Sequence, residues 1–136
     1  MANVTIAWLD EEQTIIRTHF GDPLASWSQH EAAGERVIAL ARTVSHPVYI
    51  VTTFGPNFKG PPFNTGNPFR SFEKFMGNLP PNVVFVTNVG MHIVEHFLVS
   101  MFMRIHPRIQ VKAHHADTLD EALALIRKHK TQSTGA

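Results

Sequence analysis

Two short, almost wholly apolar runs constrain the fold of this chain more than any other feature. Residues 48–51 read VYIV and residues 83–86 read VVFV, and both are rich in β-branched and aromatic side chains. A strand that is apolar on both faces is typical of a parallel sheet covered by helices on both sides. The two runs therefore predict central strands of an α/β domain.

Helical patterns alternate with further β-like runs along the chain. Because parallel strands are joined by right-handed helical crossovers, we expect an α/β fold in which a β-hairpin is followed by βα repeats. The result is a mainly parallel five-stranded sheet with four helices. The expected strands span residues 4–8, 13–20, 48–51, 83–86 and 109–113, and the expected helices span residues 26–44, 69–79, 90–106 and 118–130.

Composition narrows the class of protein. Of the 136 residues, 43% are hydrophobic and 17% charged, which excludes intrinsic disorder and fits a single domain over residues 1–130 with a disordered tail at 131–136. The absence of cysteine excludes disulfides, thiol catalysis and thiolate metal sites. A net charge of +1 argues against a nucleic-acid binder. With no secretory leader pattern and no transmembrane segment in the sequence, we expect a cytoplasmic protein.

The carboxyl ends of the parallel strands are the expected place for a ligand. A loop at residues 55–68, half of it Gly or Pro, emerges at the same edge and carries several aromatic residues. It is a lid over an apolar ligand, an interface with a second chain, or a satellite of the core. The backbone N–H groups near Asn67 also favour an anion. The candidate ligand-binding residues are Thr53, Phe58, Lys59, Phe63, Asn67, Asn88 and His114.

The nine histidines include one motif with metal-binding spacing. His92 and His96 stand in a His-x-x-Glu-His pattern, which places both imidazoles on one face of a helix, as in inverzincin metalloproteases. A catalytic zinc needs a third protein ligand, and only acids of an ordinary helix start follow downstream. The alternatives are a non-catalytic metal site at His92 and His96 with His114 or His115, or a polar helix face. The other five histidines, at 19, 30, 46, 106 and 129, are scattered, and we predict no cofactor.

The order of elements resembles the STAS superfamily, and the closest likeness is to bacterial SpoIIAA-like (STAS/SEC14-type) domains. The resemblance covers residues 3–130. It rests on Trp27 at the start of the first long helix, on the VYIV and VVFV strands, and on the TLDEAL helix start at residues 118–123. The Asp-Ser-Gly element of phosphorylated members is missing, although Ser71 lies near its place.

The resemblance implies a non-enzymatic module that binds a partner protein or a small apolar or anionic ligand. A homodimer is the default assembly for such a domain. The alternative is a small-molecule or metal-dependent enzyme that uses His92, His96 and His114.

Overall fold

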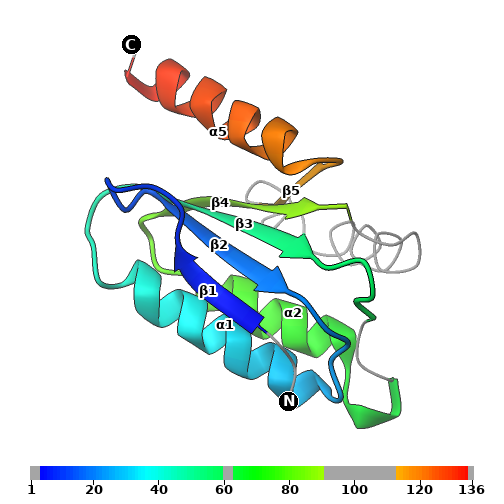
Figure 1. Ribbon diagram of the computed structural model, residues 1–136. Coiled ribbons are helices and arrows are strands. Elements are labelled where there is room, and N and C mark those ends of the chain that lie inside the picture. Colours follow the sequence, from blue (N-terminus) through cyan, green and yellow to red (C-terminus); the bar gives the residue numbers. More distant parts are fainter. Residues whose placement is uncertain (1–3, 60–62, 91–112, 135–136) are drawn as a thin grey trace.

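The computed structural model describes residues 4–59, 63–90 and 113–134 of the chain (Figure 1). In chain order the elements are β1 (Val4–Trp8), β2 (Ile15–Phe20), α1 (Trp27–Ala41), β3 (Val48–Phe54), the 3-10 helix η1 (Phe63–Thr65), α2 (Pro68–Gly77), β4 (Val83–Val89), β5 (Ala113–Ala116) and α5 (Leu119–Thr134). The five strands form one sheet in the order β1-β2-β3-β4-β5. β1 is antiparallel to β2, and the other neighbouring pairs are parallel.

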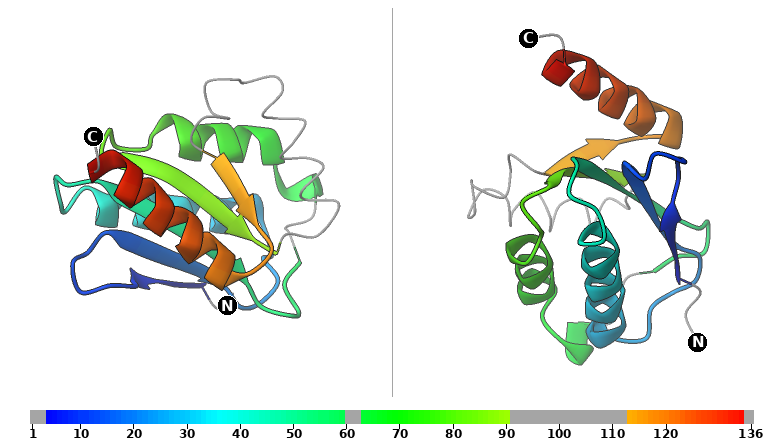
Figure 2. Two further views of the ribbon diagram at one scale, coloured as in Figure 1. Left: turned by 90° about the horizontal axis from the view of Figure 1, so that it is seen from above. Right: turned by 90° about the vertical axis from the view of Figure 1, so that its left-hand side faces the viewer.

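The predicted α/β class and the mainly parallel five-stranded sheet are thus confirmed. Helices α1 and α2 lie on one face of the sheet and α5 lies on the other (Figures 1 and 2). The described residues contain three α-helices. The helix expected over 90–106, with His92 and His96, lies outside them, as does most of the strand expected over 109–113. Strand β5 begins at Ala113 and includes both His114 and His115.

The hairpin between β1 and β2 is closed by one carboxylate. Asp10 Oδ1 accepts hydrogen bonds from the backbone N–H groups of Thr14 and Ile15, each at 2.9 Å, and Oδ2 bonds the Thr14 hydroxyl. Burial opposes ionisation of Asp10, but the Thr14 hydroxyl, the two N–H groups and Lys130 outweigh it and lower its pKa. Gln13 completes the turn with a φ of 58°. Of the three acidic residues at positions 10–12, Asp10 therefore has a structural role in the turn.

Two apolar layers hold the helices to the sheet. All four residues of the 48–51 run are at most 2% exposed, which confirms that this strand is buried on both faces. The layer under α1 and α2 consists of Ile16, Val37, Ala41, Val48, Ile50, Met76, Val83 and Val86. The layer under α5 consists of Ile15, Tyr49, Val51, Phe85, Val89, Ala116, Ala122 and Ile126.

Helix α5 starts as the sequence predicts and continues further than predicted. The Glu121 N–H donates to Thr118 Oγ1 at 3.2 Å, while the Glu121 carboxylate accepts from the Asp117 N–H at 3.0 Å. The helix continues to Thr134, where we expected a disordered tail from residue 131, because no Gly or Pro interrupts it before that point. Within the described ranges, no helix has the length and apolar character needed to span a membrane.

Candidate functional site

Three of the predicted ligand-binding residues lie at the carboxyl ends of neighbouring strands but on opposite faces. Thr53 is two residues after Val51 on β3, so both side chains face the α5 side of the sheet. His114 pairs with Thr87, and its ring lies at a tilt of 58° to that of Phe85 on the α5 side, with ring centroids 4.5 Å apart. Asn88 pairs with Thr52 and His115 and faces the α1 and α2 side. Thr53 and His114 therefore share a face that Asn88 does not.

The start of the Gly- and Pro-rich loop folds down onto the sheet edge. Phe58 is 7% exposed, and its ring lies 5.6 Å from that of Phe20 and 4.8 Å from that of Phe54. The Lys59 carbonyl accepts a hydrogen bond from the Leu24 N–H at 3.2 Å, which pins the loop here, while the Lys59 side chain is exposed. Phe58 thus belongs to a satellite of the core, one of the three arrangements that the sequence allows.

The end of the loop forms the start of α2. Asn67 Oδ1 accepts a hydrogen bond from the Arg70 N–H at 3.3 Å, so Asn67 caps the helix. Gly66 approaches Trp27 so closely that a Cβ there would stand 2.8 Å from the Trp27 side chain. The side chain of Phe63 lies outside the described residues. Of the predicted loop residues, Phe58 therefore packs in the core and Asn67 caps a helix.

A polar cluster that the sequence did not single out surrounds Thr53. Its hydroxyl oxygen lies 3.1 Å from Arg17 Nε and 2.7 Å from His19 Nδ1, and both side chains lie on the α5 face of β2. Thr53 itself is 6% exposed, whereas Arg17 and His19 are half-buried. A buried hydroxyl thus orients a guanidinium and an imidazole at the carboxyl ends of two parallel strands.

Hydrogen-bonding chemistry defines what this cluster presents. Arg17 Nε is always a donor, so the Thr53 oxygen accepts that bond and its own proton is free for His19 Nδ1. Burial, and then the Arg17 charge, lowers the pKa of His19, so the imidazole is neutral at pH 7. A neutral ring that accepts at Nδ1 carries its proton on Nε2. The cluster therefore presents the two terminal N–H groups of the guanidinium as donors, and in this tautomer His19 Nε2–H beside them.

The cluster adjoins an exposed part of the sheet. Helix α5 packs on β3, β4 and β5. On the same face of β1, Thr5 and Ala7 are exposed, and Leu9 is 39% exposed. Among the residues that the structure describes, no carboxylate lies within ion-pair distance of Arg17.

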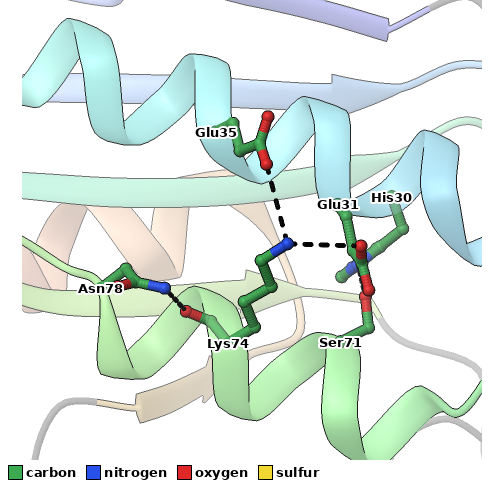
Figure 3. Close-up of polar contacts among 6 residues, drawn as sticks. All are labelled: His30, Glu31, Glu35, Ser71, Lys74 and Asn78. Atoms are coloured by element: carbon green, nitrogen blue, oxygen red, sulfur yellow. Dashed lines mark hydrogen bonds and ion pairs between the residues drawn. The ribbon is translucent and has the colours of Figure 1, made fainter.

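A second polar pair joins α1 to α2 (Figure 3). His30 Nδ1 lies 3.1 Å from Ser71 Oγ. The imidazole stacks on Phe20 with an interplanar angle of 11° and meets Trp27 edge-on at 5.5 Å. Burial lowers the pKa of His30, and the charge of Glu31 opposes this shift. The ring is therefore a neutral, packed member of the helix interface.

A serine beside a histidine is also the pattern of an activated nucleophile. Ser71, however, is 1% exposed and lies in the interface between two helices. The same two helices are joined next to it by Lys74 Nζ, which lies 3.6 Å from Glu31 and 3.8 Å from Glu35 (Figure 3). These contacts indicate that the His30–Ser71 bond positions α2 against α1.

The histidines of β5 bear on the metal hypothesis. His114 and His115 are adjacent on a strand, so their side chains point to opposite faces of the sheet. His115 Nε2 lies 3.3 Å from Asp117 Oδ1. Within residues 4–59, 63–90 and 113–134, no three His, Asp or Glu side chains are grouped as metal ligands. A site at His92 and His96 stays a prediction, since both residues lie outside these ranges.

No protein-family model, curated protein or solved structure matches this chain. The STAS resemblance therefore remains a prediction that rests on the order of elements and on the residues quoted for it. What the chain itself adds is the Arg17–His19–Thr53 cluster. Its sequence signal is the alternation along β2, which places residues 17 and 19 on the face opposite to Ile16, Thr18 and Phe20.

Proposed function

We propose that this protein is a non-catalytic, STAS-like binding module whose ligand lies on the α5 side of the sheet, against β1 and the carboxyl end of β2. The observation that carries the proposal is the Arg17–His19–Thr53 cluster, in which a buried hydroxyl holds two donor side chains beside an exposed strand. Arranging such donors costs side-chain entropy, and a bound ligand offsets that cost.

The character of this sheet face supports the same proposal. Parallel strands are usually covered on both faces, whereas the exposed face of β1 adjoins the parallel pair β2–β3 directly. A bound ligand would cover this region. The predicted loop gives less support, because Phe58 packs into the core. Of the predicted residues, Thr53 therefore contributes most directly to the proposed site.

A small-molecule or metal-dependent enzyme stays the alternative. It requires the imidazoles of His92, His96 and His114 to converge. Within the described ranges, the His114 ring packs at a tilt against the Phe85 ring, as expected for a packed aromatic pair. This contact favours binding over catalysis as the role of the α5 side.

Native mass spectrometry of the gently purified full chain tests the proposal. We expect a small molecule to be retained by the wild type and by Ala32→Trp, which adds the same bulk on the exposed side of α1. Ala7 pairs with Arg17 in the β1–β2 ladder, so the Ala7→Trp side chain occupies the exposed face beside Arg17. This variant should therefore lose the ligand. Equal retention by both variants would contradict the proposed location.

We also propose that β1 pairs with β1 of a second copy. β1 is an edge strand that reads VTIAW, without the charges or proline that usually protect an edge. The Leu9 N–H donates to the Ile15 carbonyl, and the direction of the backbone groups alternates along a strand. The backbone N–H and C=O groups of Val4, Ile6 and Trp8 therefore point away from β2. Antiparallel pairing about a two-fold axis at Ile6 would place Val4 opposite Trp8 of the other copy.

Light scattering during gel filtration tests this dimer. The same axis places Thr5 opposite Ala7 of the other copy, so the T5K/A7K double variant brings like charges directly together. We expect a dimeric wild type and a monomeric T5K/A7K. The A32K/A39K variant adds the same charge on the exposed side of α1 and should stay dimeric. A wild type that is monomeric at every concentration would overturn the dimer and leave the ligand site untouched.

A further inference from the structure

We propose that the Arg17–His19–Thr53 cluster binds an oxyanion, namely the carboxylate or phosphate group of a small molecule. The inference rests on the proposed function and names the chemical class of its ligand. It follows from three properties of the cluster: the kind of polar group it presents, the absence of a counter-charge among the described residues, and the fixed position of the guanidinium.

The first property is that the polar groups directed at a ligand are donors. The Nε atom of Arg17 bonds Thr53 at 3.1 Å, which leaves the two terminal nitrogens of the guanidinium for a ligand. His19 Nδ1 bonds the same hydroxyl at 2.7 Å, which leaves Nε2 on the other side of the ring. In the tautomer whose Nδ1 accepts from Thr53, both side chains present only N–H donors, and such a set selects a group that only accepts hydrogen bonds. Carboxylate and phosphate oxygens are such groups, and a guanidinium matches their geometry with two parallel bonds.

The second property is the unbalanced charge. Arg17 is half-buried, and a buried cation is normally paired with an acid. None of the described carboxylates lies within ion-pair distance of it, and its bonded partner Thr53 is neutral. Asp10, at the other end of β2, is occupied by the backbone of its own turn. An anionic ligand would therefore supply the counter-charge that Arg17 lacks among the described residues.

The third property is preorganisation. Thr53 lies in the sheet with 6% of its surface exposed, and it is the residue that pairs with His19 between β2 and β3. Its hydroxyl thus has a position set by the strand ladder, and the Arg17 side chain is held along the sheet by that bond. A guanidinium that is already oriented loses less conformational entropy when the anion binds. Thr53 acts in this way as a positioning residue.

Calorimetric titration of the full chain with inorganic phosphate, and separately with sodium acetate, tests the inference in a chloride buffer at pH 7. For the wild type we expect saturable binding with a dissociation constant of about 1 mM. Arg17→Gln keeps a polar side chain but removes the charge and the two parallel N–H donors of the guanidinium, and should weaken binding about ten- to a hundred-fold. Arg17→Lys keeps the charge without the two parallel N–H donors and should give an intermediate dissociation constant. Arg127→Gln removes an exposed cation of α5 and should bind as the wild type does.

The readouts separate this inference from the proposed function. Circular dichroism confirms that each variant is folded before it is titrated. Absence of saturable heat with either anion, or equal binding by Arg17→Gln and the wild type, would overturn the oxyanion inference. If Arg17→Gln still retains the native small molecule that Ala7→Trp loses, the binding module stands and its ligand is not an anion. Phosphate binding without acetate binding would restrict the ligand to phosphorylated molecules and would still support the inference.

Discussion

Replacing Ser71 by Ala tests whether the His30–Ser71 pair stabilises the helix interface. The substitution leaves His30 Nδ1 without its partner at a residue, Ser71, that is 1% exposed. An unsatisfied buried polar group costs about 1–3 kcal/mol. Alanine forms helices more readily than serine, so the substitution also stabilises α2 by about 0.5 kcal/mol. The net expectation is a loss of about 0.5–2.5 kcal/mol of unfolding free energy, or roughly 2–9 °C in Tm for a chain of this size.

Urea unfolding at pH 7.5, followed by circular dichroism, measures this difference. Ser28→Ala is the matched control, because Ser28 is an exposed residue of α1 whose hydroxyl bonds the Ser26 hydroxyl at 2.8 Å. Its stability should stay within about 0.5 kcal/mol of the wild type. The small molecule detected by native mass spectrometry should be retained by both variants. A Ser71→Ala protein as stable as Ser28→Ala would refute a structural role for the pair, and loss of the ligand in Ser71→Ala alone would indicate a functional one.

Two further predictions concern acid sensitivity and the loop. Burial lowers the pKa of His30, and burial followed by Arg17 lowers that of His19. The unfolded chain therefore takes up protons near pH 6.5 before the folded chain does, and stability should fall as the pH drops through that value, by at most about 1.4 kcal/mol per pH unit for each histidine. A Tm that is equal at pH 8 and pH 5 would contradict this. Gly55→Ala places a Cβ 2.6 Å from the Gly21 carbonyl oxygen and should cost about 1–3 kcal/mol, whereas a Cβ at Gly77 meets no atom within 4 Å. Thermal melts in which Gly55→Ala and Gly77→Ala are equally stable would contradict the close approach of the loop.

Much of the fold is predictable because the spacing of apolar residues along the sequence differs between helices and strands. The VTIAW run is the strand Val4–Trp8, and the buried VYIV run lies at the centre of the sheet. The end of α5 was less predictable, since the basic residues at its expected C-terminus are compatible with both an ending and a continuing helix. Element type thus follows from local pattern, while element ends depend on contacts that local pattern does not contain.

The candidate site was less predictable, because it depends on register between strands. His115 pairs with Asn88, and His114 pairs with Thr87 one residue earlier, so the single-residue offset sends Asn88 and His114 to opposite faces. Arg17 reaches Thr53 diagonally across the β2–β3 ladder, where its own partner is Val51. No spacing within the sequence encodes these pairings.

The histidines show the same limit. His19 and His30 appear scattered in the sequence, yet each is hydrogen-bonded to a buried hydroxyl from a distant element. The histidines whose spacing indicated a metal site either lie outside the described residues or point to different faces of β5. Spacing identifies sites carried by one element, whereas this site is assembled from two strands.

The position at which a small oxyanion contacts the folded chain is the most direct test of the proposed site. An amide chemical-shift map of the full, 15N-labelled protein during a phosphate titration measures this. The proposed site predicts that the largest shifts cluster at Arg17, His19 and Thr53, with smaller ones at Thr5 and Ala7 on the neighbouring strand. Shifts that instead concentrate at the start of α2, around Asn67 and Arg70, or no shifts at all, would contradict it.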